Sequence, residues 1–266
     1  MSYTEHFDMW FIAITASWIV GLILILLPLT KKFKIAGNSL LGLGFILLLS
    51  FISLLWLRID RAPMKTIGET RLWFSLFLGL LGYFLYWRKH YIWVLAPSII
   101  VSALFLFISY KYPENFDKYL APALNSPWFI PHVLSYILGY TLLTSSSLVA
   151  LKGLGAILFN KYKPETLALV DNLVFTGFAF LTCGLLLGAL WAKQAWGHYW
   201  TWDIKEIWSL ITWFSWLIYI HIRYSHPEKK IVPLCFICLA LLVLLFGWMG
   251  LHYLPAAGLS IHNFMN

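Results

Sequence analysis

Residues 191–216 read WAKQAWGHYWTWDIKEIWSLITWFSW, and long apolar segments lie on both sides of this stretch. Seven of the chain's fifteen tryptophans fall within it. An interfacial aromatic belt of a membrane protein would distribute its rings over all the loops. Tryptophan faces instead form a wide, rigid, apolar wall when they gather in one place. The stretch therefore favours a platform for a flat ligand, set between two membrane segments.

The composition places the whole chain in a membrane. Of its 266 residues, 61% are hydrophobic and only 11% are charged, whereas soluble domains have about 45–50% apolar and about 25% charged residues. The apolar runs are continuous rather than alternating, which predicts helices and excludes a barrel. The net charge of +8 comes from basic residues scattered at helix ends, which is typical of membrane topology and gives no indication of nucleic acid binding.

Eight apolar runs are long enough to cross a bilayer. We expect an all-α, polytopic helical bundle in one membrane domain, 1–266, with spans at about 9–29, 38–57, 72–88, 91–110, 131–151, 172–190, 205–224 and 232–250. Lys and Arg are more numerous in one set of alternate loops, and the acidic residues gather in the other set. By the positive-inside rule both termini lie outside, together with an external tryptophan-rich segment at 191–213.

Two residues of this segment predict its local structure. Gly197 permits a tight bend in the middle of the rings. Asp203 stands where a helix N-cap belongs, and Glu206 follows three residues later. This spacing predicts a capping box at the start of the seventh span.

The histidines fall at two levels of the predicted bundle. His132 opens the fifth span and His262 lies in the tail, so both are expected at the outer surface, as are His198 and His252. His221 lies near the inner end of the seventh span, where its role as a ligand or as an interfacial residue stays open.

This inventory matches the needs of haem. Haem requires one or two axial imidazoles, an apolar cavity and cationic donors for its propionates. Zinc would require three or four ligands at short spacings. The candidate propionate partners on the outer side are Arg58, Arg61, Arg71 and His198.

Residues 196–213, WGHYWTWDIKEIWSLITW, resemble the tryptophan-rich WWD signature of the haem-handling family of cytochrome c biogenesis proteins. Within that family the resemblance is to the CcsA (ResC) type, the membrane subunit of System II cytochrome c synthetases. It extends more weakly to 63–78, to SPWFIPHVLSYILGY and to the tail GLHYLPAAGLSIH. Two departures are His198, where the family would have Arg, and Ile204, where it would have Pro.

The resemblance implies a set of site residues. His132 and His262 match the external axial ligands of the haem iron, and His221 matches an intramembrane ligand. The external haem platform matches Trp196, Gly197, His198, Trp200, Trp202 and Asp203. No catalytic side chain is implied, and the ligand and substrate is haem b.

The resemblance also implies the function and its setting. The chain would transport or present haem and attach it to the CxxCH motif of apocytochrome c, outside the cytoplasmic membrane. It would act with a CcsB-like membrane protein that has an external domain, and with a thiol-reducing, thioredoxin-like protein. The alternatives are a CcmC-like haem exporter that loads a membrane chaperone, and a transporter or haem b respiratory subunit without maturation activity.

Overall fold

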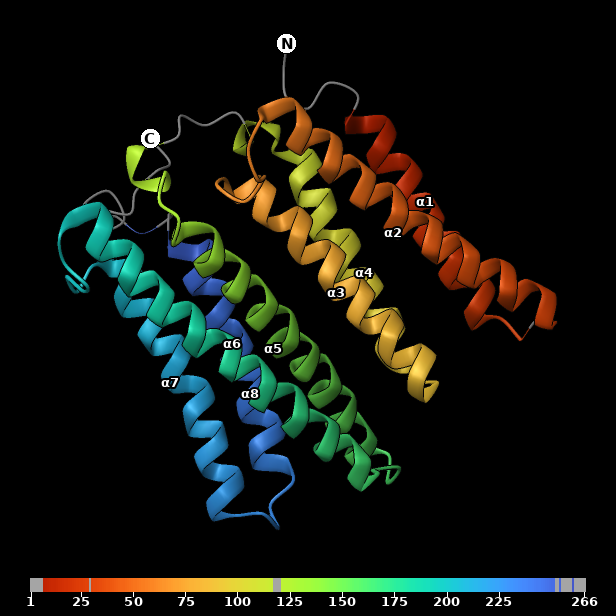
Figure 1. Cartoon of the computed structure of the whole chain (residues 1–266). Coiled ribbons are helices and arrows are strands. Elements are labelled where there is room, and N and C mark those ends of the chain that lie inside the picture. The colour runs from red at the N-terminus through yellow and green to blue at the C-terminus, as the bar shows by residue number, and fades with distance from the viewer. Residues whose placement is uncertain (1–6, 29, 117–120, 252–253, 255–259, 261–266) are drawn as a thin grey trace. The chain divides into compact units, whose positions relative to one another are not determined.

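The computed structural model describes residues 7–28, 30–116, 121–251, 254 and 260. The chain divides into two compact units, Met1–Lys118 (unit 1) and Tyr119–Asn266 (unit 2), and each is described by itself. Both units are helical, as predicted (Figure 1). The sequence predicts a single membrane domain, which would require the two units to associate. This stays a prediction.

Unit 1 contains α1 (Phe7–Leu26), α2 (Lys31–Ile59), α3 (Ile67–Lys89), α4 (Ile92–Lys111) and a short 3₁₀ turn, η1 (Pro113–Asn115). Helix α1 packs on α2 and α4, and α3 packs on α4 and α2. Small residues bring these helices close together, as is usual in lipid. A Cβ atom on Gly21 of α1 would lie 2.8 Å from the carbonyl oxygen of Gly37 in α2. Between α3 and α4, Ser75 Oγ donates a hydrogen bond to Ser102 O at 2.7 Å.

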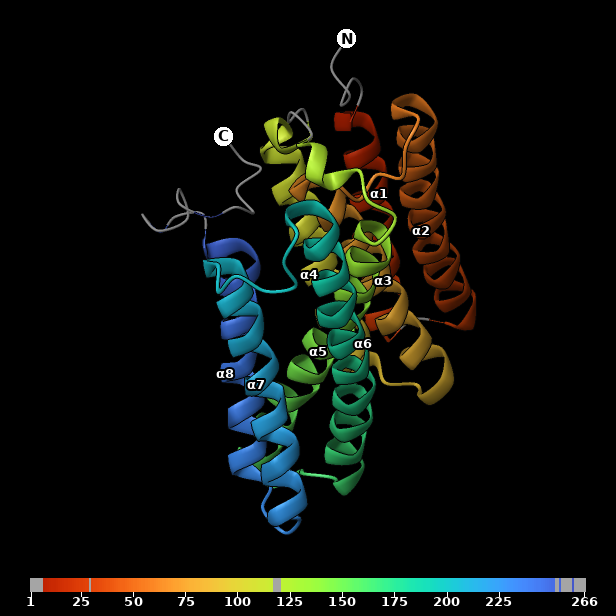
Figure 2. The ribbon, with the colours of Figure 1, turned by 60° about the vertical axis from the view of Figure 1, so that its left-hand side comes forward.

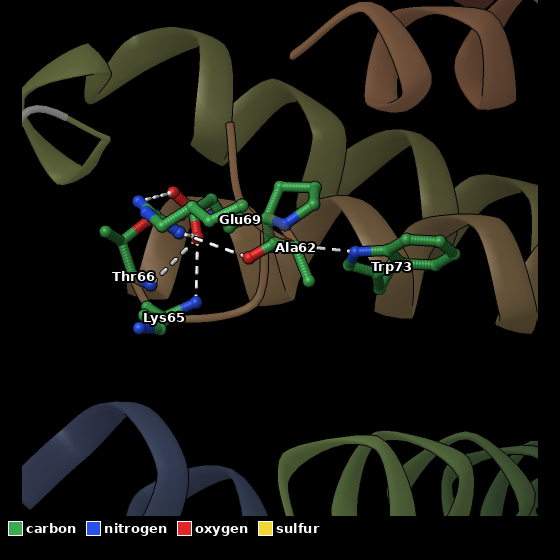
Figure 3. Close-up of polar contacts among 7 residues, drawn as sticks. Ala62, Lys65, Thr66, Glu69 and Trp73 are labelled. Carbon is green, nitrogen blue, oxygen red and sulfur yellow. Dashed lines mark hydrogen bonds and ion pairs between the residues drawn. The ribbon is translucent and has the colours of Figure 1, made fainter. Parts of the chain in front are cut away.

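The loop between α2 and α3 is tied to one buried carboxylate (Figure 3). Glu69 is only 2% exposed and accepts two hydrogen bonds from the Arg61 guanidinium, at 2.6 and 2.9 Å. It also accepts from the backbone N–H of Lys65 at 2.7 Å and of Thr66 at 3.2 Å. Thr66 Oγ1 accepts from Glu69 N, which completes a capping box and sets the first residue of α3.

Unit 2 contains a 3₁₀ turn, η2 (Pro122–Leu124), then α5 (Phe129–Leu158), α6 (Pro164–Trp196), α7 (Ile204–Ser225) and α8 (Ile231–Leu245), and a π turn, η3 (Phe246–Gly250). Helix α5 packs on α6 and α8, and α7 packs on the same two neighbours, which makes a four-helix bundle. Figure 2 shows α7 and α8 side by side. Consecutive helices run in opposite directions, so the start of α5, the end of α6 and the start of α7 share one end of the bundle (Figures 1 and 2).

Within the described residues, six helical segments are long and apolar enough to cross a membrane: α1, α2, α4, α5, α6, and the run Ile231–Gly250. The chain is therefore a multi-pass helical membrane protein. Within the described residues, α3 and α7 are not among these segments, because they contain more polar residues than the six and their hydropathy is too low. The eight crossings and the outer position of both termini stay predictions. Helix α6 extends beyond both ends of the predicted span 172–190, from Pro164 to Trp196, and the bounds of the membrane-crossing part stay a prediction.

Candidate functional site

His132 lies in the first turn of α5, and α6 holds its imidazole in place. The His132 Nδ1 atom is 2.7 Å from the carbonyl oxygen of Gly184. Because a carbonyl only accepts, Nδ1 carries the hydrogen, and the lone pair of the neutral ring lies on Nε2. Histidines that bind metals through Nε2 usually hold Nδ1–H in this way. The orientation of His132 therefore suits an axial ligand.

Two glycines of α6 make room for this arrangement. A Cβ atom on Gly188 would lie 2.7 Å from both Cε1 and Nδ1 of His132. A Cβ on Gly184 would lie 2.6 Å from Cδ2 of Tyr136, one turn further along α5. Gly184 and Gly188 have the GxxxG spacing of close-packed membrane helices. That spacing is the sequence signal for this close contact between α5 and α6.

Trp191 is the tryptophan that contacts His132. The two rings stack with centroids 5.5 Å apart and planes 27° apart. Trp191 is 5% exposed, and its Nε1–H donates to Ala123 O at 2.7 Å. Its ring also meets Phe129 at 5.0 Å and Trp196 at 4.9 Å. Trp191 belongs to the predicted tryptophan-rich segment, although the site residues that the resemblance implies begin at Trp196, and it links His132 to Trp196.

A row of aromatic side chains continues from His132 along α5. Tyr136 meets His132 edge-on at 4.8 Å, and Tyr140 meets Tyr136 at 5.4 Å. Tyr140 in turn contacts Trp248 of η3 at 5.4 Å. The spacing of four residues between His132, Tyr136 and Tyr140 places them on one face of the helix. The histidine thus lies at the signature-loop end of this row of rings within unit 2.

The signature loop, residues 197–203, joins α6 to α7. Gly197 adopts a left-handed conformation, φ 84°, and its N–H caps α6 by donating to Lys193 O. This confirms the predicted bend. Trp202 also has a positive φ of 61° and is 67% exposed. Trp200 meets it edge-on at 6.0 Å. The buried Trp200 Nε1 has no hydrogen-bond partner within the described part of the chain.

The end of the signature loop is rigid. Asp203 is the N-cap of α7, and Glu206 completes the predicted capping box. Glu206 is 7% exposed and accepts from Thr201 N at 2.7 Å and from Asp203 N at 3.2 Å. Asp203 Oδ1 accepts from Lys205 N at 2.9 Å and from Ser260 Oγ, also at 2.9 Å. The loop is therefore anchored to α7 and to a residue of the tail.

The other predicted site residues are placed as follows. His198 lies in the signature loop with an exposed side chain. His262 and His252 lie outside the described residues. In unit 1, Arg71 is buried, 6% exposed. Arg61 is bound by Glu69, so a propionate would have to compete with that carboxylate for its charge.

His221 lies at the opposite end of α7 from the signature loop and is exposed. It follows the first residue of α7 by 17 positions, about 25 Å along the helix. The opposite face of this last turn packs on α6, where Asp171 accepts from Tyr219 Oη at 2.6 Å and from Arg223 Nε and Nη2 at 2.9 Å each. This partly buried ion pair joins the two helices. An aspartate within an apolar helix is the sequence signal for such a partner.

Comparison with known proteins identifies the family of the chain. Residues 67–257 match the family model "Cytochrome C assembly protein". The chain is 32% identical over 247 residues to "Cytochrome c biogenesis protein CcsA" of Chlamydomonas reinhardtii, covering 85% of this chain and 68% of that relative. It is 30% identical over 246 residues to the protein of the same name from Welwitschia mirabilis, covering 79% of this chain and 80% of that one.

A solved structure shares the fold. "Cytochrome c Heme Lyase CcmF" superposes with a TM-score of 0.72 over 93% of this chain, at 19% sequence identity. This chain spans 47% of that protein's length. At this identity the superposition shows a shared fold only. The family is shown by the family model and by the sequence relatives. The chain therefore belongs to the cytochrome c assembly protein family and is of the CcsA type.

Proposed function

We propose that this chain binds haem b at the signature-loop end of unit 2 and presents it for attachment to apocytochrome c, as the CcsA-like subunit of a System II cytochrome c synthetase. The observation that carries the proposal is the His132 imidazole, whose Nδ1–H is held by Gly184 O at 2.7 Å and whose ring stacks on Trp191. An oriented imidazole beside a tryptophan-rich loop, in a chain of this family, fits an axial ligand of haem iron.

Trp196, the last residue of α6, and the residues of the signature loop fit the rest of the haem. The apolar faces of Trp196, Trp200 and Trp202 would lie against the porphyrin. The buried Trp200 Nε1–H, which has no partner within the described residues, would donate to an acceptor on the haem edge. His198, exposed in the same loop, would contact a propionate. His262 would be the second external ligand.

The chemistry of attachment requires position rather than a catalytic side chain. Each of the two cysteine thiols of a CxxCH motif adds across one haem vinyl group. A carbon–sulfur bond forms, the thiol hydrogen goes to the neighbouring vinyl carbon, and no oxidant is consumed. The chain's contribution would be to hold the two reactants at a fixed place and to protect the iron with two imidazoles. The thiols must be reduced beforehand, which accounts for a thioredoxin-like partner.

His221 would serve haem at the inner side. Its side chain is exposed, away from the Asp171–Arg223 face of α7, so it suits a ligand shared with another protein. We place the CcsB-like partner there, as the source of the second inner imidazole. The signature loop then lies outside the cytoplasmic membrane, in agreement with the distribution of Lys and Arg.

The test uses the chain purified with its CcsB-like partner. Single His132→Gly, His262→Gly and His221→Gly variants are compared by optical spectra of bound haem and by holocytochrome yield, with and without added imidazole. We expect each variant to lose haem or change its ligation, and imidazole to restore it. His226→Gly, in the exposed loop after α7, is the matched control and should behave as wild type.

The same experiment separates the alternatives. Normal holocytochrome yield from His132→Gly and His262→Gly would refute the proposal. A complex that binds haem at His132 but transfers it only to a membrane chaperone would support a CcmC-like exporter instead.

A further inference from the structure

A cavity of about 710 Å³ lies at the end of unit 2 opposite to the signature loop. Two loops line it: the α5–α6 loop, with Ile157, Asn160 and Tyr162, and the α7–α8 loop with the first residues of α8, residues 228–232. Both loops lie at the same end of the bundle (Figures 1 and 2). The proposed haem site makes no use of this cavity.

The backbone on both sides of the cavity is held by hydrogen bonds. Asn160, just after the end of α5, has a left-handed conformation with φ 54°. The next residue, Lys161, donates its N–H to Ala156 O at 2.7 Å, which closes the end of the helix. On the other side, Arg223 Nη1 donates to Pro227 O at 3.0 Å. The walls of the cavity are therefore ordered parts of unit 2.

The side chains of the cavity carry more positive than negative charge. Lys229 and Lys230 both line it. Lys230 Nζ lies 5.3 Å from the centroid of the Tyr162 ring, and this cation–π contact joins the two loops. Glu228 also lines the cavity, and its Oε1 is 3.6 Å from His226 Nδ1. Two ammonium groups against one carboxylate favour an anionic ligand.

Apolar side chains lie beside these charges. Leu158 and Phe159 end α5 and follow it, Ile231 and Val232 begin α8, and all four are exposed. Both α5 and the run Ile231–Gly250 are long and apolar enough to cross a membrane. Exposed apolar residues at the ends of such helices face acyl chains. The cavity therefore combines basic groups with an apolar border that faces lipid.

We propose that this cavity binds the headgroup of an anionic phospholipid, with the acyl chains against the exposed apolar side chains of α5 and α8. The ammonium groups of Lys229 and Lys230 pair with the phosphate, and the Tyr162 hydroxyl donates to a phosphate oxygen. Basic pockets between the ends of membrane helices suit such headgroups. Free phosphate gains the same polar contacts but buries no acyl chain, so the lipid binds more tightly. This inference is independent of haem binding.

The experiment titrates the full chain, purified in detergent, with dioctanoyl phosphatidylglycerol and follows bound lipid by native mass spectrometry. Zwitterionic dioctanoyl phosphatidylcholine and inorganic phosphate are titrated in parallel. One double variant, Lys229→Gln with Lys230→Gln, removes the charges. The matched control is Lys31→Gln with Lys32→Gln, which changes two adjacent exposed lysines at the start of α2. Val232→Trp fills the cavity and keeps both of its lysines.

We expect phosphatidylglycerol to bind at one site, and phosphatidylcholine and inorganic phosphate to bind at least about tenfold more weakly. Each lysine near a lipid surface contributes about fivefold in affinity, so loss of Lys229 and Lys230 should weaken binding about 25-fold. The Lys31 and Lys32 control should bind as wild type does. Val232→Trp should lose the lipid, and its unfolding midpoint without lipid should stay unchanged.

Three outcomes would overturn the proposal. An equal loss of affinity in the Lys31 and Lys32 control would mean that the lipid follows surface charge in general. Inorganic phosphate binding as tightly as the lipid would mean a site for soluble anions. Wild-type lipid affinity in Val232→Trp would mean that the lipid lies elsewhere. Haem titration should be unchanged in every variant, so failure of this proposal leaves the proposed function standing.

Discussion

Replacing Gly188 by alanine tests whether α6 orients the His132 imidazole. The new Cβ would lie 2.7 Å from His132 Cε1 and Nδ1, whereas ordinary contacts begin at 3.4 Å. The ring must therefore retreat by about 0.7 Å. A retreat of that size would stretch the 2.7 Å contact from Nδ1 to Gly184 O to about 3.4 Å, beyond the usual N–H···O range of about 2.7–3.2 Å.

The consequences for stability and for ligand binding differ. Alanine gains about 0.5–1 kcal/mol over glycine within a helix, and loss of one hydrogen bond costs about 0.5–1.5 kcal/mol. These effects nearly cancel, so the unfolding midpoint of Gly188→Ala should change little. Loss of the partner that orients a metal-binding histidine typically lowers affinity about 10- to 100-fold. Haem affinity should fall by that factor.

The assay is haem titration of the purified complex, followed by its absorption spectrum. Gly155→Ala is the matched control, because a Cβ there meets no atom within 4 Å, and it should bind haem as wild type does. Wild-type affinity and spectrum in Gly188→Ala would refute the inference that the contact with Gly184 orients His132, the proposed iron ligand.

Three further substitutions test other parts of the site. Gly197→Ala forces a side chain into the left-handed conformation, φ 84°, and should cost about 1–2 kcal/mol, seen as a lower unfolding midpoint. Trp200→Phe removes a buried N–H that has no partner within the described residues; haem affinity should fall several-fold in titration while stability stays unchanged or rises. Asp171→Asn weakens the bidentate pair with Arg223, whose side chains are 18% and 15% exposed. It should cost about 1–2 kcal/mol in thermal unfolding and leave the external haem spectrum unchanged.

Features that depend on neighbouring residues could be predicted from the sequence. The capping box of Asp203 and Glu206 and the bend at Gly197 are both present, because their signals lie within one turn of the chain. The helical membrane class followed from composition. The helix ends do not follow from the apolar runs alone, because α6 extends from Pro164 to Trp196, beyond the predicted span and into the tryptophan-rich segment.

Features that depend on two distant segments could not be predicted in the same way. The contact of His132 with Gly184, and that of Asp171 with Arg223, join residues 52 positions apart. Their local signals, a GxxxG pair and an aspartate within an apolar helix, indicate that a partner exists but do not identify it.

The two ends of the signature loop explain why its tryptophans can act as one surface. Gly197 is the C-cap of α6, and Asp203, six residues later, is the N-cap of α7. A loop of this length between two capped helices has few conformations, so its rings are ordered largely before a ligand arrives. If the aromatic side chains were mobile, the ligand would have to order them on binding, and this would lower its affinity. His132 is oriented in the same manner by α6, through Gly184 and Trp191. The rigidity of the helix ends, rather than the number of indoles, is therefore what should make this end of unit 2 suitable for a large flat ligand.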